Sequence, residues 1–109
     1  MRAKDIAKGQ HYAYSPCQWG KTYVPHHQWW RVEVLVAGTP DGPSYTRHEV
    51  VQVDDVSGAW QRYADGNPRI FTATSAELRQ TWSEHETELE SHWRILRAQA
   101  AQRGVLRFA

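Results

Sequence analysis

The alternation of apolar and polar residues before Thr74 predicts a sheet of short strands. The clearest segment is residues 29–37, whose alternate positions are apolar: Trp30, Val32, Val34 and Val36. Side chains at alternate positions of a strand share one face, so these four residues form one apolar face. Four further segments have β-rich composition, namely residues 10–15, 44–53, 60–63 and 69–72. Turn sequences at 38–43 and 64–68 separate them, and residues 29–53 therefore predict a hairpin. Residues 60–63 also fit a single helical turn.

After Thr74 the apolar period changes to that of a helix. Residues at spacings of three, four and seven form one stripe: Leu78, Trp82, Leu89, Trp93, Leu96 and Ala100. The sequence Thr74-Ser75-Ala76-Glu77 matches a capping box, which marks a helix N-terminus. No Gly or Pro occurs from 76 to 103, and Gly104 supplies a stop. The pattern predicts a helix over 76–103, with glutamates in its first half and arginines in its second.

These elements predict an α+β fold. Residues 1–74 are expected to form a small antiparallel SH3-like β-barrel of four or five short strands. Residues 75–104 are expected to form a C-terminal amphipathic helix, and 105–109 a short tail. The 28 residues from 76 to 103 extend ~42 Å as a helix, whereas the barrel is only ~30 Å across. About a third of the helix is expected to overhang, unless it bends or frays after Ala98.

Composition narrows the class of protein. The chain has 109 residues, which suits one domain, and its single cysteine excludes an internal disulfide and fits a reducing cytoplasm. No apolar run approaches the ~20 residues that span a bilayer, and the charged start lacks a secretory signal. A cytoplasmic protein with no membrane contact is expected. The net charge of +1 does not by itself indicate nucleic-acid binding.

Two groups of side chains have types that bind metals. His85, Glu88 and His92 lie near one helix face, but their spacing differs from that of metalloprotease helices. A packed histidine at the edge of the apolar stripe is the simpler interpretation. The second group is His11, Cys17, His26 and His27, and it has no second cysteine. We expect no metal and no cofactor.

The sequence contains no catalytic signature. It has no nucleophile elbow and no glycine-rich phosphate loop. Cys17 is a lone thiol, and the adjacent acids Asp54 and Asp55 are expected to cap a turn. These observations favour a protein that is not an enzyme.

Aromatic residues make up 12% of the chain, more than a small core needs. In the first third they alternate with basic residues: Lys8, Tyr12, Tyr14, Trp19, Lys21, Tyr23, Trp29 and Arg31. Single-stranded nucleic-acid proteins use such mixtures, and peptide grooves of small barrels also use aromatic rings. About half of the rings are expected to be structural, with Tyr12, Trp30 and Trp60 in the core. The expected ligand-binding set is Trp19, Lys21, Tyr23, Trp29 and Arg31.

The first fourteen residues, Met1-Arg2-Ala3-Lys4-Asp5-Ile6 followed by a short turn and His11-Tyr12-Ala13-Tyr14, resemble the start of small proteins from actinobacteria and their phages. Residues 51–60, ending in Trp60, are similar to a later element of those proteins. The resemblance covers about 60 residues and implies a small Tudor- or KOW-like barrel. The long loop at 16–28 and the C-terminal helix depart from it.

These patterns together predict a non-catalytic binding protein. By the resemblance it is an accessory or regulatory protein of a phage or actinobacterium, acting on a host protein or nucleoprotein complex. The expected partner contact is the helix stripe, namely Trp82, Leu89, Trp93 and Leu96, against another protein or in a homodimer. The alternatives are a barrel that binds single-stranded nucleic acid or DNA, and a metal-dependent enzyme using His85 and His92.

Overall fold

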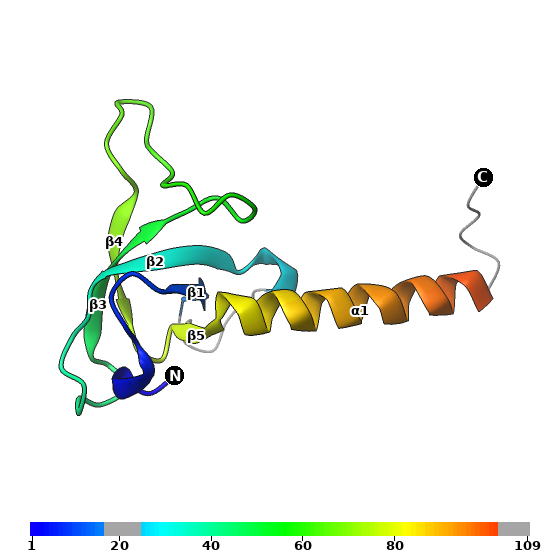
Figure 1. The fold of residues 1–109 in the computed structure, drawn as a ribbon, viewed down its shortest axis with the longest axis horizontal. Coiled ribbons are helices and arrows are strands. Elements are labelled where there is room, and N and C mark those ends of the chain that lie inside the picture. Colours follow the sequence, from blue (N-terminus) through cyan, green and yellow to red (C-terminus); the bar gives the residue numbers. More distant parts are fainter. Residues whose placement is uncertain (17–24, 103–109) are drawn as a thin grey trace.

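The computed structural model describes residues 1–16 and 25–102 and has an α+β architecture (Figure 1). Within these residues, five strands form one antiparallel sheet and a long helix follows them. The strands are β1 (His11–Tyr14), β2 (Trp30–Val36), β3 (Arg47–Gln52), β4 (Ile70–Thr74) and β5 (Leu78–Thr81); the helix is α1 (Trp82–Gln102). Two 3-10 helices, η1 (Ala3–Asp5) and η2 (His26–Gln28), precede β1 and β2. Gly104 and the tail 105–109 lie outside the described residues.

The strand order is β4-β3-β2-β1-β5, so the last strand returns to pair with the first. Tyr12 at the centre of β1 lies opposite Val32 on one side and Thr81 on the other. Strands β4 and β5 form the two edges, and the sheet is not closed. The turn between them is held by backbone hydrogen bonds, because the Ser75 N–H donates to the Thr46 carbonyl and Glu77 accepts from the Ser15 N–H.

Four predicted strands are confirmed: residues 10–15 contain β1, 29–37 contain β2 and 44–53 contain β3, while 69–72 overlaps β4. The predicted hairpin is the antiparallel pair of β2 and β3. Residues 60–63 form no continuous strand, and their pairing is limited to two isolated bridges, Val53 with Trp60 and Arg62 with Pro68. This part of the chain extends from the sheet as a long connection between β3 and β4 (Figure 1).

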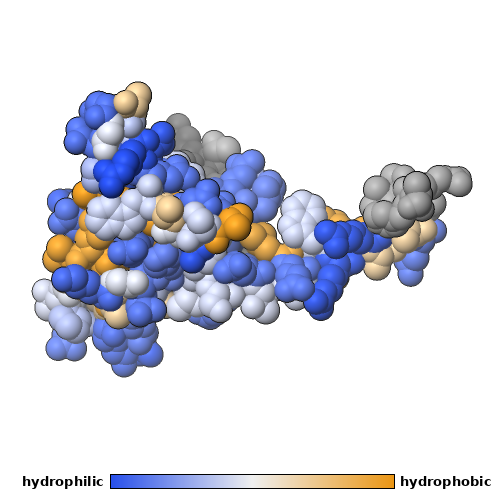
Figure 2. All heavy atoms as spheres, turned by 45° about the horizontal axis from the view of Figure 1, so that its top comes forward, coloured by the Kyte–Doolittle hydropathy of each residue, from blue (hydrophilic) through white to orange (hydrophobic). Residues whose placement is uncertain are grey.

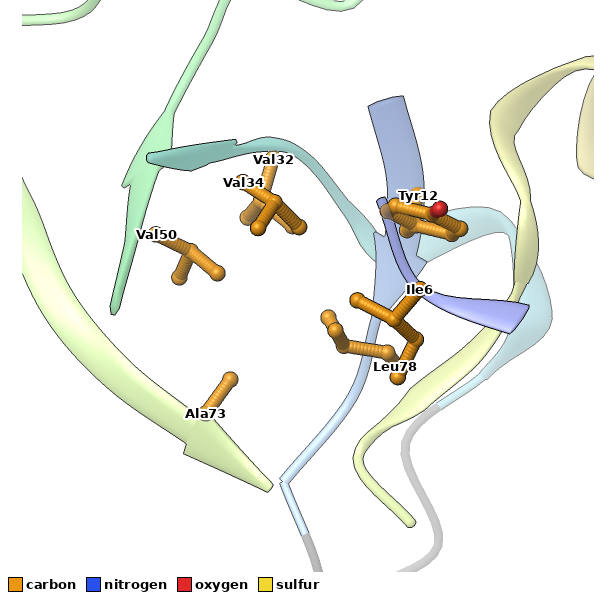
Figure 3. Close-up of a cluster of buried hydrophobic side chains, with 7 residues drawn as sticks. All are labelled: Ile6, Tyr12, Val32, Val34, Val50, Ala73 and Leu78. Carbon is orange, nitrogen blue, oxygen red and sulfur yellow. The ribbon is translucent and has the colours of Figure 1, made fainter. Parts of the chain in front are cut away.

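The core lies on one face of the sheet and draws on all five strands (Figure 3). Its buried side chains are Ile6, Tyr12, Val32, Val34, Val50, Ala73 and Leu78. The hydroxyl of Tyr12 is satisfied locally, because it accepts a hydrogen bond from the Ala7 N–H at 2.8 Å and donates to the Asp5 carbonyl at 3.2 Å. These bonds hold the N-terminal segment over the core, since a buried hydroxyl without partners is costly.

His48 is a buried polar link between two turns. Its Nδ1 accepts the Gly38 N–H at 2.9 Å, so the ring proton lies on Nε2 and is donated to the Ser75 hydroxyl at 2.8 Å. Burial lowers the pKa of His48 below its usual 6.5. The neutral ring thereby joins the β2–β3 connection to the turn between β4 and β5.

The helix begins at Trp82, and the predicted start at residue 76 is wrong. A second capping box decides the boundary: Glu84 N–H donates to the Thr81 hydroxyl at 3.2 Å, and the Thr81 N–H donates to the Glu84 carboxylate at 3.2 Å. The Thr74–Glu77 sequence makes a related bond, from the Thr74 N–H to the Glu77 carboxylate at 2.9 Å, but closes the turn before β5. Leu78 is therefore a core residue of a strand and not part of the helix stripe.

We expect Thr81→Ala to lower the free energy of unfolding by about 1 kcal/mol and to reduce the helical circular-dichroism signal, because it removes the cap. Ser91→Ala, at an exposed mid-helix position, is the control and is expected to change stability by less than about 0.5 kcal/mol. Urea unfolding measures both. Equal stability of the two variants contradicts the assignment of Thr81 as the N-cap.

Stability is expected to fall on acidification below pH 6.5, because His48 has a lowered pKa in the folded protein. The unfolded chain then binds more protons than the folded one, so stability present above pH 6.5 is lost as the pH falls. His48→Gln is expected to cost about 1–3 kcal/mol at neutral pH and to show a smaller loss on acidification than the parent. Urea unfolding at neutral and mildly acidic pH tests this, with the exposed His92→Gln as control. If the His48→Gln variant loses as much stability on acidification as the parent does, His48 is not the cause of the pH dependence.

Candidate binding surface

Helix α1 is attached to the sheet by its N-terminal end. Its first residue, Trp82, is only 6% exposed, and the Arg31 guanidinium lies over its ring, 5.6 Å from the centroid. One turn further, His85 is fully buried and stacks on Trp29, with ring centroids 5.4 Å apart and planes 15° from parallel. A cation over an indole and two stacked rings fix the direction of the helix from the first turn.

Beyond this attachment the helix projects from the sheet (Figure 1). Its 21 residues span ~31 Å, and the molecule measures 51 × 33 × 26 Å. Helical spacing places Leu89, Trp93 and Leu96 in line with Trp82, on the continuation of the stripe that packs against the sheet. We call these three residues the distal helix face. Side chains of both hydrophobic and hydrophilic character lie along this part of the helix (Figure 2).

Trp93 is the most prominent residue of the distal helix face. Its side chain is 46% exposed, while Leu89 and Leu96 are partly exposed. The His27 ring contacts it edge-on, with centroids 6.4 Å apart. Of the four stripe residues predicted to meet a partner, Trp82 is buried in its own molecule, and the other three retain exposed surface. The side chain of Ala100 lies outside the part of the chain that the structure describes.

On the face of the sheet opposite the core, a polar network lies beside the attachment of the helix. The Nδ1 atom of His11 accepts a hydrogen bond from Arg31 Nε at 2.9 Å, so the ring proton lies on Nε2. Nε2 lies 3.2 Å from the Glu33 carboxylate, which also accepts from Trp60 Nε1 at 3.4 Å. Both nitrogens of His11 are used inside the protein, so this ring is arranged as a structural bridge and not as a general base.

Arg31 also holds the start of the long connection between β3 and β4, because its guanidinium donates to the Asp55 carbonyl at 3.1 Å. The Asp54 carboxylate caps this turn, accepting the Ser57 N–H at 2.8 Å and the Val56 N–H at 3.0 Å. These two bonds, with one from the Ser57 hydroxyl, lower the pKa of Asp54. The turn-capping prediction for this acid is confirmed.

Two members of the predicted ligand-binding set, Trp29 and Arg31, belong to the part of the chain that the structure describes. Trp19, Lys21 and Tyr23 lie outside the part of the chain that the structure describes. Trp29 is stacked on His85, and Arg31 is engaged by Trp82, His11 and Asp55. The two described members therefore serve the attachment of the helix.

Within residues 1–16 and 25–102, no three His, Cys, Asp or Glu side chains lie close enough together to hold a metal ion. Gln80 lies between His85 and Glu88, with its Nε2 3.2 Å from His85 Nδ1 and 3.2 Å from the Glu88 carboxylate. Cys17 lies outside the described residues, as does the side chain of His26.

Two tryptophans assigned to the core by sequence are exposed, and that assignment is wrong. Trp30 is 47% exposed and Trp60 is 41% exposed. Trp30 forms an aromatic corner with Tyr14 and Phe71, whose rings meet edge-on at 4.8 Å, beside a hollow of about 330 Å³. The alternation in β2 gave the correct face, but Trp30 lies at the strand end, where the core stops.

A larger cleft of about 490 Å³ lies at the attachment of the helix. Its lining mixes both signs of charge, with the carboxylates of Asp5 and Glu86 and the guanidinium of Arg31. A polyanion such as nucleic acid is not favoured by a cleft that presents two carboxylates.

Comparisons with known protein families, with curated proteins and with solved structures found no match. Among the described residues, no helix has both the length and the apolar character that crossing a bilayer requires.

We expect Arg31→Ala to lower the free energy of unfolding by about 1–3 kcal/mol, because it leaves His11 and the Asp55 carbonyl without a donor and uncovers Trp82. Arg31→Lys is expected to recover little of this loss, since an ammonium cannot reproduce the planar set of donors. Arg47→Ala, on an exposed position of β3, serves as the matched control. If Arg31→Ala is as stable as this control, the network does not hold the helix.

Proposed function

We propose that the protein is a non-catalytic binding protein, and that the distal helix face docks on another protein chain. The observation that carries this proposal is the exposed indole of Trp93 on a helix that extends beyond its own sheet. Tryptophan is enriched among the residues that dominate binding energy at protein interfaces. A helix that presents apolar residues at spacings of three and four fits the recognition of a helix or groove on a partner.

The energy available from this face is appreciable. Trp93 is 46% exposed, which leaves on the order of 100 Å² of ring surface for a partner to cover. At ~25 cal/mol per Å² its burial contributes roughly 2.5 kcal/mol, to which Leu89 and Leu96 add. This is one contribution to a binding energy, which must also offset the translational and rotational freedom lost on association.

The use of the polar residues supports binding over catalysis and over nucleic-acid recognition. His11 is bonded through both nitrogens, and Arg31 is held by Trp82 and Asp55. Nucleic-acid binding depends on cations that are free to approach phosphates. Arg31 lacks that freedom, and so the apolar helix face is the stronger candidate.

We also propose that the sheet is a partly open SH3-like barrel. The support is its strand order, in which β5 crosses back to pair with β1. A second support is the contact between Tyr14 on β1 and Phe71 on β4, at 4.8 Å. These strands are separated by two others in the sheet, so a coiled sheet explains the contact better than a flat one.

Photo-crosslinking tests the docking proposal. With p-benzoylphenylalanine in place of Trp93, irradiation of cells that express the protein is expected to give a discrete protein adduct, whose crosslinked peptide identifies the chain in contact. The control carries the same group in place of Ser91, which is exposed and lies on the opposite side of the helix. Identical adducts at both positions, or no protein adduct at position 93, would show that the distal helix face is not a docking site.

A further inference from the structure

The charges of helix α1 are segregated along its length. Its first nine residues carry four glutamates, namely Glu84, Glu86, Glu88 and Glu90, whereas Arg94 and Arg97 follow. The helix macrodipole acts mainly within the terminal turns, and only Glu84 lies in the first turn while no basic residue lies in the described last turn. The macrodipole therefore accounts for one acid of the four and for neither arginine.

Glu90 and Arg97 are placed to flank the distal helix face. They are seven residues apart, which is close to two helical turns, so they lie on the same side of the stripe. Trp93 lies between them in sequence. Both side chains are exposed, and Glu90 forms an ion pair within its own helix, with Arg94 at 2.6 Å.

The sheet restricts the direction in which a second helix can approach. Trp82 and His85, on the N-terminal part of the stripe, are already covered by the protein's own body. A parallel copy would bring its own sheet into the same space, because its sheet also covers that end of its helix. An antiparallel copy places the two sheets at opposite ends of the paired helices (Figure 1).

We propose that the distal helix face binds a second copy of the chain in antiparallel orientation, with the twofold axis close to Trp93. This inference rests on the docking proposal and names its occupant. Glu90 of each copy lies beside Arg97 of the other, so the acidic half of one helix faces the basic half of its partner. The overlap that is symmetric about this axis runs from Leu89 to Ala98, a stretch of ~15 Å. It is smaller than a standard stable interface, and the dimer is expected to dissociate in the micromolar range.

Charge-reversal variants test both the dimer and its orientation. The dissociation constant of each variant is measured by light scattering and sedimentation over a concentration series. Glu90→Arg and Arg97→Glu each replace two attractive contacts with two repulsive ones in an antiparallel dimer. Each is expected to raise the dissociation constant by about tenfold at low salt. The double variant restores both contacts and is expected to return to within about threefold of the parent. In a parallel dimer positions 90 and 97 lie at different heights along the helix pair and do not meet, so the double variant would not restore what a single variant loses.

The outcomes separate this inference from the docking proposal. Trp93→Ala is expected to abolish the dimer without reducing the helical signal. A monomer up to about millimolar concentration, or a dimer insensitive to all charge reversals, overturns the antiparallel pairing. If the chain is a monomer and its crosslink at position 93 forms with a different protein, then the second copy is not the occupant. The docking proposal itself is supported by that result. A self-adduct at position 93, with rescue by the double variant, supports both.

Discussion

The attachment of helix α1 by a single turn governs the form of this molecule. Trp82 lies beneath the Arg31 guanidinium, and His85 stacks on Trp29, so the helix axis is fixed at one end. The Arg31 guanidinium is held in turn by His11 and by the Asp55 carbonyl, which stiffens the attachment. The remainder of the helix then projects without needing contacts of its own with the sheet. Trp93 lies beyond this attachment, where it contacts the His27 ring and is still 46% exposed.

The sequence predicted the elements better than their boundaries. Alternation located β1, β2 and β3 because half-buried strands must place apolar residues at every second position. The start of the helix was misplaced because two segments, beginning at Thr74 and at Thr81, both match a capping box. Local chemistry does not distinguish them. Tertiary structure does, since Leu78 between them is buried in the core as a strand residue.

The candidate site could be predicted only in part. Periodicity correctly placed Leu89, Trp93 and Leu96 on one stripe, and helix length indicated an overhang. The structural use of Arg31 and Trp29 could not be read from the sequence, because their partners lie on other elements, more than twenty residues away in the case of Asp55 and His85. A pattern of aromatic and basic residues records composition, whereas the contacts that occupy them depend on the fold.

The charges beside Trp93 are better explained by a role in orienting a bound partner than by a role in stabilising the monomer. The Glu90–Arg94 pair is well exposed, and exposed pairs at this spacing contribute only a few tenths of a kcal/mol to a helix. Apolar contacts such as those of Trp93 supply affinity but select direction poorly, because a ring can be covered from several approaches. Flanking charges penalise the wrong direction through like-sign contacts. In the proposed dimer, an acidic segment followed by a basic one, on a helix whose first turn is already covered, would restrict the second copy to the one direction in which opposite charges meet.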